Sequence, residues 1–157
     1  MSQNQNSAGR AVISSTGLFT PGETITNEEL VESYNRYVEI FNADNAQAIA
    51  AGEVAELQPS SVEFIEKASG IKARHVMTKA PILDPETMAP RMRERSNDEP
   101  SVMAEIGVKA ARDALKRAGR DVADVDAVLC AASNMERAYP AMAIEIQQEL
   151  GIDGGDS

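Results

Sequence analysis

Residues 125–157, VDAVLCAASNMERAYPAMAIEIQQELGIDGGDS, contain the stretch that decides the fold class. The stretch opens with a continuous apolar run at 125–132, which is typical of a strand covered on both faces in a parallel sheet. A polar loop separates this run from a helix that Pro140 is expected to open and Gly151 to end. The apolar face of that helix consists largely of Met142, Ile146 and Leu150. A strand followed by a helix predicts an α/β fold, and we expect the return strand to be missing from this sequence.

Before residue 58, the sequence predicts one further strand and two helices. An apolar, β-branched segment at 10–16 is expected to form a strand before the Pro-Gly turn of TPGET. Thr26 and Glu29 have capping-box spacing at the start of a helix that continues to Phe41. Residues 46–57 predict a weaker helix, because they have a helix-forming composition that Gly52 interrupts.

Two more helices and a long connection are predicted in the middle of the chain. Ser60 and Glu63 have capping-box spacing in front of a short helix that Gly70 would end. Residues 79–100 contain four prolines and predict an extended connection with at most short helical turns. A long helix is then expected up to Gly119. Its expected inward positions are Val102, Ile106, Ala110, Ala114 or Leu115, and Ala118.

Composition excludes several classes of protein. The chain has 157 residues, of which 43% are hydrophobic, so it is long enough to bury a core. It has 25 acidic and 15 basic residues and a net charge of −10, which disfavours binding to nucleic acid or to an anionic membrane surface. Neither a long apolar run nor a leader-like N-terminus is present, so we expect a cytoplasmic protein. Residues 1–9 are expected to form a polar tail.

The sequence offers few residues for metal or redox chemistry. Cys130 is the single cysteine, which excludes an internal disulfide, and His75 is the single histidine. A zinc site made of cysteine and histidine would need more ligands than these two. Carboxylate ligands remain an alternative, but no spaced Asp/Glu motif indicates them. We therefore expect no metal site and no resident cofactor.

Three segments, in order, resemble the N-terminal part of the beta-ketoacyl-acyl-carrier-protein synthase III family. They are AVISSTGLFTPGETITNEEL, FIEKASGIKARHV and AARDALKRAGRDVADVDAVLCAASNMERAYPAMAIEIQQELGIDG. The resemblance spans residues 10–154, and its most specific parts are SGIKARH and the block around YPAMA. It implies a partial thiolase-like fold: the N-terminal part of the first βαβαβ-type half, with helical insertions.

The resemblance also implies a function for the intact parent. Enzymes of the family join an acyl thioester to malonyl-acyl-carrier protein in a decarboxylative Claisen condensation, as homodimers. Their nucleophilic cysteine and its partner histidine and asparagine lie beyond the part that this chain resembles. We therefore expect residues 10–157 to be an incomplete N-terminal domain that lacks the strand of the catalytic cysteine and the C-terminal half, holds no catalytic residue and is inactive by itself.

The resemblance further suggests substrate-binding residues. Phe64 matches the position where the family usually has a tryptophan that stacks on the adenine of coenzyme A, although packing in a helix core is an equal alternative. Ala68 replaces the family's nucleotide-contacting arginine, which favours an acyl-carrier-protein donor over acyl-CoA. Lys67 and Lys72 could still contact a phosphate, and Ser69 lies beside them.

A second set of residues is expected at the acyl pocket. Tyr139 and Pro140 match the aromatic-proline pair that, in the family, reaches across the homodimer and closes the neighbouring subunit's pocket. Met135 and Met142 could line the same apolar tunnel, although methionine also fills gaps in ordinary cores. The alternative for Tyr139 is a structural cap whose hydroxyl needs a partner.

Cys130 and His75 are expected to have structural roles. Cys130 falls within an apolar strand, where a thiol would be an inert core residue. His75 is expected to anchor a turn, since the family's catalytic histidine lies elsewhere. Two other functions stay open: a non-catalytic half-protein that pairs with a separate C-terminal chain or serves as an assembly partner, and a small independent α/β binding module.

Overall fold

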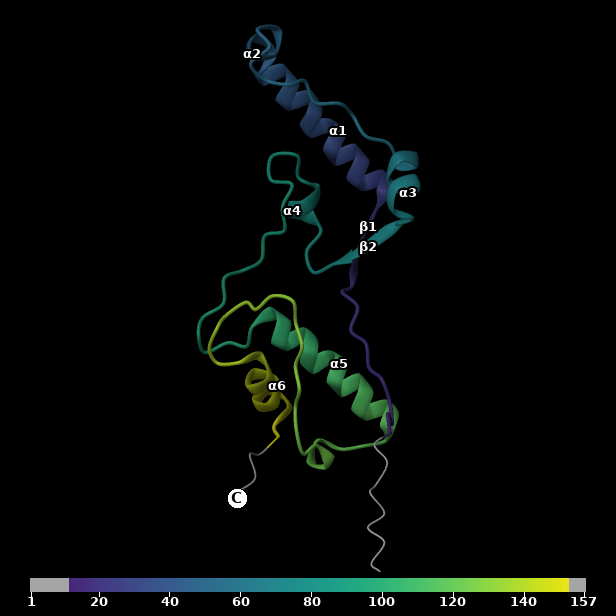
Figure 1. Cartoon of the computed structure of the whole chain (residues 1–157), viewed down its shortest axis with the longest axis vertical. Helices are drawn as coiled ribbons and strands as arrows, with labels where there is room; N and C mark the ends of the chain where they lie inside the picture. Colours follow the sequence, from purple (N-terminus) through teal and green to yellow (C-terminus); the bar gives the residue numbers. More distant parts are fainter. Residues whose placement is uncertain (1–11, 153–157) are drawn as a thin grey trace, which may run out of the picture. The chain divides into compact units, whose positions relative to one another are not determined.

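The structure is a computed structural model that describes residues 12–152. The polar tail expected at residues 1–9 lies outside the described residues. Residues 20–94 form one compact unit, and the described residues on either side of them form a second unit (Figure 1). The first unit contains β1 (Glu23–Thr26), α1 (Asn27–Asp44), α2 (Ala46–Ala50), α3 (Val62–Ser69), β2 (Ala73–Val76) and α4 (Ala80–Leu83). The second contains α5 (Val102–Ala118), a 3-10 turn (Val122–Asp124) and α6 (Met142–Leu150).

The unit of residues 20–94 is organised around a two-stranded antiparallel sheet and the long helix α1. Strand β1 pairs with β2 so that Thr24 lies opposite His75, and Ile25 on β1 is completely buried. The predicted capping box at the start of α1 is confirmed. The Thr26 hydroxyl accepts a hydrogen bond from the backbone N–H of Glu29 at 3.3 Å, and the Glu29 carboxylate accepts one from the backbone N–H of Thr26 at 3.0 Å.

Three expectations for this unit need correction. The TPGET turn leads directly into β1, so its last residues belong to a strand. The helix expected at 46–57 ends after Ala50, because Gly52 adopts a positive φ of 76° that a helix cannot contain. The N-cap of α3 is Ser61, since its hydroxyl accepts from the backbone N–H of Phe64 at 3.2 Å, and the expected Ser60 is not the cap.

Two other expectations for this unit, at Gly70 and in the connection at 79–100, are confirmed. Gly70 ends α3 in the left-handed conformation, with φ at 71°. Within the connection at 79–100, the structure has one short helix, α4. Among residues 12–152, no helix combines the length and the hydropathy that a membrane span requires.

The second unit is built on the packing of α5 against α6. Its buried cluster consists of Ala104, Val108, Ile146 and Leu150. The inward stripe predicted for α5 is only partly buried, because α6 packs on the face that carries Ala104 and Val108 instead. Gly107 permits this approach, since a Cβ atom there would lie 2.8 Å from the Ile146 side chain. Helix α5 ends as expected, with Gly119 in the left-handed conformation, and Ser101 is its N-cap.

The two predicted strands of this unit are wrong for the described residues. Residues 12–16 and 125–132 are assigned to no strand, and the only sheet in residues 12–152 is β1–β2. The reason is physical: a strand forms only when its backbone groups pair with a neighbour, and apolar composition alone supplies none. The last helix begins at Met142, with Ala141 as N-cap, so Pro140 lies just before it. Helices and a small sheet agree with an α/β class, whereas the thiolase-like arrangement stays a prediction.

Candidate functional site

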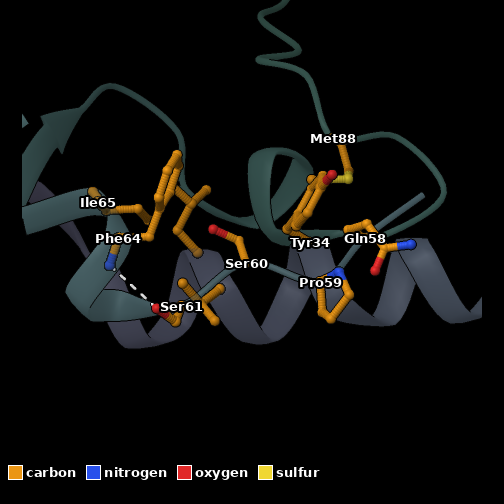
Figure 2. A pocket seen from close by; sticks show the side chains of 10 residues that line it. Tyr34, Gln58, Pro59, Ser60, Ser61, Phe64, Ile65 and Met88 are labelled. Carbon is orange, nitrogen blue, oxygen red and sulfur yellow. Dashed lines mark hydrogen bonds between the residues drawn. The ribbon is translucent and has the colours of Figure 1, made fainter. Parts of the chain in front are cut away.

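An apolar groove lies between α1 and α3 in the unit of residues 20–94 and has a volume of about 790 Å³. Its apolar lining consists of Leu30, Val31, Pro59, Phe64, Ile65 and Met88. Its polar lining consists of Tyr34, Gln58, Ser60 and Ser61. Figure 2 shows Phe64 and Ile65 at one end of the groove and Met88, Tyr34 and Gln58 toward the other. A concave apolar site with a few neutral polar groups is the usual form of a small-molecule site.

Two asparagines of α1 hold the wall of the groove. The Asn35 side chain donates to the Ser60 carbonyl at 3.1 Å and accepts from the Ser60 N–H at 2.8 Å. Asn42, two turns further along α1, makes the same pair of bonds with Leu57, at 2.9 and 3.0 Å. Each side-chain amide therefore makes the pair of hydrogen bonds with the extended segment 57–60 that the backbone of a neighbouring strand would otherwise make. This arrangement satisfies backbone groups that would otherwise need another partner and fixes the segment against α1.

Phe64 forms one end of the groove from the first turn of α3. Its side chain is 67% exposed, and its backbone N–H is held by the Ser61 cap. A large aromatic ring with so much accessible surface gains free energy when an apolar partner covers it. Among the described residues, Phe64 therefore lies at the edge of the groove and outside the buried core.

Met88 reaches the groove from a tight turn after α4. Its φ of 43° lies in the left-handed region, which is uncommon for a residue that is not glycine. Asp84 organises the turn: its carboxylate accepts from the Glu86 N–H at 3.1 Å and from the Thr87 hydroxyl at 2.7 Å. These two bonds, the Thr87 bond foremost, lower the pKa of Asp84.

The other substrate-binding residues suggested by the sequence do not line the groove. Lys67 and Lys72 are exposed, Lys67 in the last turn of α3 and Lys72 just before β2. The Ser69 hydroxyl donates to the Ile65 carbonyl at 2.8 Å and accepts from the Ile71 N–H at 3.1 Å, so it stabilises the end of α3. Of the four predicted residues, only Phe64 belongs to this groove.

The base of α1 carries a charged and hydrogen-bonded network. Lys79 donates to Glu29, and this bond, followed by that from the Thr26 N–H, lowers the pKa of Glu29. Asn27, which is 1% exposed, donates to the Ile71 carbonyl at 2.7 Å and accepts from Arg74 at 3.1 Å. The network ties α1 to the segment that leads into β2 and to the residue before α4.

His75 has the structural setting that the sequence suggested. Its Nδ1 atom lies 3.1 Å from the Pro21 carbonyl and 3.4 Å from the Thr24 hydroxyl. The ring therefore connects β2 to the turn that precedes β1. In the described part of the chain, no group of three or more His, Cys, Asp and Glu side chains is placed to hold a metal ion.

The residues expected at an acyl pocket lie in the second unit. Tyr139 is 89% exposed and Met135 is 69% exposed. Pro140 lines a small cavity of about 80 Å³ beside Arg137 and Glu145. Met142 packs against the buried cluster of α5 and α6. The described residues thus do not bring the four side chains into one pocket.

Cys130 requires a correction. It is exposed, with its Sγ atom 3.4 Å from the Met142 sulfur, and is not the buried core residue expected from the sequence. Burial had been inferred from a strand at 125–132, and this segment pairs with no other among the described residues.

Glu145 joins the start of α6 to the start of α5. Glu145 is 4% exposed, and its carboxylate accepts from the Ser101 N–H at 2.9 Å and from the Ser101 hydroxyl at 2.8 Å. Ser101 is completely buried, and its hydroxyl also caps α5. Arg137 lies 3.7 Å from the same carboxylate. A negative group at the N-terminal ends of two helices is favourable, because unpaired N–H groups point toward it.

The chain is similar to curated ketosynthases over most of its length. It is 56% identical over 124 residues to the beta-ketodecanoyl-[acyl-carrier-protein] synthase of Pseudomonas aeruginosa, covering 79% of this chain and 35% of that protein. It is 35% identical over 96 residues to a beta-ketoacyl-[acyl-carrier-protein] synthase III of Brucella anthropi, covering 61% of this chain and 24% of that protein. Over 146 residues it is 24% identical to a synthase of the same name from Caulobacter vibrioides, covering 93% of this chain and 32% of that protein. No family model matches the chain.

These relatives limit what the similarity conveys. The chain spans about a third or less of the length of the curated relatives that it matches. The activities in their names belong to the whole proteins, of which this sequence represents one part.

Proposed function

Because the chain is homologous to part of the beta-ketoacyl-acyl-carrier-protein synthase III family, we propose that it forms part of a condensing enzyme of fatty-acid or related acyl biosynthesis. The observation that carries the proposal is the 56% identity over 124 residues to a beta-ketodecanoyl synthase. The fold proposed for the complete protein is thiolase-like, with this chain in its first half. The proposed location is the cytoplasm.

The reaction would be a decarboxylative Claisen condensation. A cysteine thiolate of the complete enzyme attacks the carbonyl carbon of an acyl thioester and expels the carrier thiol. Malonyl-acyl-carrier protein then loses CO₂, and the electron pair of the broken bond forms a thioester enolate. The enolate carbon attacks the enzyme-bound acyl group, which forms the new carbon–carbon bond and releases the cysteine thiolate.

The role proposed for this chain is binding. The groove at Phe64 and the segment around Tyr139 would contribute to the acyl-thioester site, and Tyr139 with Pro140, Met135 and Met142 would contact the partner subunit of a homodimer. Ala68 stands where the family has a nucleotide-contacting arginine, which supports an acyl-carrier-protein donor. The catalytic cysteine, histidine and asparagine would come from a C-terminal part, on the same or on a separate chain.

The proposal can be tested on the protein as its source produces it. An affinity tag at the start of this sequence in its own gene would allow purification of whatever protein contains it, together with any chain that accompanies it. The intact mass would give the length of the native polypeptide. An assay of this protein with an acyl thioester and malonyl-acyl-carrier protein should show a β-ketoacyl product and one CO₂ for each product formed. A polypeptide of the 157 residues by itself should give none. Absence of product from the native protein, or turnover by the 157 residues that Cys130→Ala abolishes, would refute the proposal.

A further inference from the structure

We propose that Arg137, held by the buried carboxylate of Glu145, positions Tyr139 and thereby sets the acyl-length preference of the complete enzyme. This inference rests on the proposed function, which places Tyr139 at the acyl-thioester site. It goes further by naming two residues that would not touch the substrate and yet control the residue that does. Arg137 is thus a positioning residue and not a catalytic one.

The segment that carries Tyr139 has little structure of its own. Residues 131–140 belong to no helix or strand. In the described part of the chain, no backbone–backbone hydrogen bond involves any residue of this segment. Tyr139 is 89% exposed and Met135 is 69% exposed. A fixed position for the Tyr139 ring must therefore come from side chains that attach the segment to the rest of its unit.

Arg137 is the side chain of residues 131–139 that turns inward. The other residues of this range are exposed, whereas the Arg137 side chain is 19% exposed. Its Nη1 atom lies 3.7 Å from Oε1 of Glu145, whose side chain is 5% exposed. A buried carboxylate needs a counter-charge, and salt screens a buried pair much less than a surface pair. The contact should therefore hold the segment more firmly than a surface pair such as Arg120 and Asp124, which are 62% and 47% exposed.

Glu136 supplies a second attachment. Its carboxylate accepts a hydrogen bond from the backbone N–H of Met103 at 3.3 Å. Met103 lies in the first turn of α5, where N–H groups have no partner within the helix and attract negative charge. Glu145 is itself bonded to Ser101, the N-cap of α5. Two consecutive residues of the segment, Glu136 and Arg137, therefore connect it to the start of the same helix.

These attachments lie close enough to Tyr139 to restrict it. Two residues of chain span at most about 7 Å, so Tyr139 cannot move far from Arg137. On its other side, Pro140 has a fixed φ and lines the cavity of about 80 Å³ that Arg137 and Glu145 also line. Tyr139 is thus held between two residues that meet at one cavity, while its own side chain stays exposed.

The contacts separate positioning from a purely structural role. Glu145 joins α6 to α5 through Ser101, so the two helices do not depend on Arg137. Neither Arg137 nor Glu145 is exposed, so a substrate would meet Tyr139 and not the pair. Loss of Arg137 should release the segment 131–140 and leave α5 and α6 in place. The Tyr139 ring would then have to be ordered when the substrate binds, which weakens its contribution to selectivity.

The expected effect is on selectivity between acyl groups. The measured quantity is the preference, in kcat/KM, for the best of hexanoyl-, octanoyl- and decanoyl-acyl-carrier protein over the next best. Because the cost of ordering one side chain corresponds to about two- to tenfold in binding, Arg137→Gln should reduce this preference by about that factor. The KM for malonyl-acyl-carrier protein should stay unchanged. Arg137→Lys keeps the positive charge and should lose a smaller part of the preference.

The test uses steady-state kinetics of the native protein, with circular dichroism to verify that each variant keeps its helices. Arg120→Gln is the matched control, because it removes the same charge from an exposed pair of the same unit. The decisive variant combines Arg137→Gln with Tyr139→Ala. Since Arg137 acts through Tyr139, the double variant should have the preference of Tyr139→Ala alone. Arg137→Lys carries the test if Arg137→Gln does not fold.

A second measurement does not depend on turnover. With 3-fluorotyrosine incorporated into the native protein, Tyr139→Phe identifies the fluorine resonance of Tyr139. This resonance should narrow in Arg137→Gln, because the released ring becomes more mobile. It should keep its width in Arg120→Gln.

The outcomes decide whether Arg137 positions Tyr139. An unchanged preference in Arg137→Gln, additive effects of the changes at Arg137 and Tyr139, or an unchanged fluorine resonance would each overturn the inference. A reduced preference that Arg137→Lys largely retains, together with non-additivity, would support it. An inactive native protein would refute the proposed function instead, and the fluorine resonance would still show whether Arg137 holds the Tyr139 ring.

Discussion

Replacement of Glu145 should loosen the packing of α5 against α6 by an amount that the structure allows to be estimated. In Glu145→Ala, the N–H and the hydroxyl of the fully buried Ser101 lose their acceptor. Each unsatisfied buried donor costs about 1–3 kcal/mol, and partial entry of water should reduce the sum, so we expect a loss of about 3 kcal/mol. In Glu145→Gln, the amide oxygen can still accept from the Ser101 N–H and the amide NH2 can donate to the Ser101 hydroxyl oxygen, so the main loss is the charge assistance, which corresponds to about 1 kcal/mol.

Hydrogen exchange measured by mass spectrometry can resolve this effect within the molecule. Exchange of the α5 and α6 amides should become roughly 150-fold faster in Glu145→Ala and roughly fivefold faster in Glu145→Gln, since about 1.4 kcal/mol corresponds to a factor of ten. Peptides from α1 lie in the other unit and serve as an internal standard. Glu149→Ala, an exposed glutamate of the same helix, is the matched control and should leave the exchange unchanged.

Two results would refute this reasoning. Equal exchange rates in Glu145→Ala and the parent chain would show that the buried carboxylate does not hold the two helices. A larger effect of Glu145→Gln than of Glu145→Ala would show that the buried amide NH2 facing the Ser101 donors, and not the loss of an acceptor, dominates at this site.

Three further outcomes follow from particular contacts. Gly17→Ala should detach residues 12–19 from α5, because the added Cβ would lie 2.0 Å from a backbone oxygen of that helix. Gly22→Ala should be neutral, because no atom lies within 4 Å of a Cβ at that position. Limited proteolysis would show the difference between the two variants. The hydrogen bond from the Leu18 N–H is the largest cause that lowers the pKa of Asp113 in the folded chain. The stabilisation from this bond should therefore be complete above about pH 4, the pKa of an unfolded aspartate, and should be lost as the pH falls through the lower pKa of the folded chain. Exchange of the Leu18 amide should report this loss, and Asp113→Asn, which keeps an acceptor at all pH values, should abolish the pH dependence. Tyr139→Ala in the native enzyme should alter acyl-length preference more than malonyl use; an unchanged length profile in steady-state kinetics would count against a pocket role.

Features set by neighbouring residues could be predicted from the sequence. The capping box of α1 and the glycine ends of α3, α5 and α6 depend on bonds within a few residues, so local spacing was sufficient. The adjacent Ser60 and Ser61 could not be distinguished in this way. The structure separates them through Asn35, which lies far away in the sequence and binds the backbone of Ser60.

Features that depend on distant partners were not predictable from the local pattern. The apolar run at 125–132 has the composition of a buried strand, but strand formation and the burial of Cys130 both require a neighbouring strand that the described residues do not supply. Phe64 was identified through the family resemblance, whereas Asn35, Asn42 and Met88 were missed. Asparagine in mid-helix is a poor helix former, and its recurrence after two turns was the available signal that these side chains bind another segment.

The most direct test of the central claim, that this chain is a working part of a ketosynthase, is an exchange of segments. The matched region of the Pseudomonas aeruginosa beta-ketodecanoyl synthase would be replaced by that of this chain, with which it shares 56% identity over 124 residues. The measurement is the rate of β-ketoacyl product formation from an acyl thioester and malonyl-acyl-carrier protein, with the unaltered synthase as reference. The account predicts a folded chimaera with a rate within about tenfold of the reference, equivalent to a change of about 1.4 kcal/mol in transition-state stabilisation. A chimaera that folds, assembles as the reference does and forms no product would contradict it.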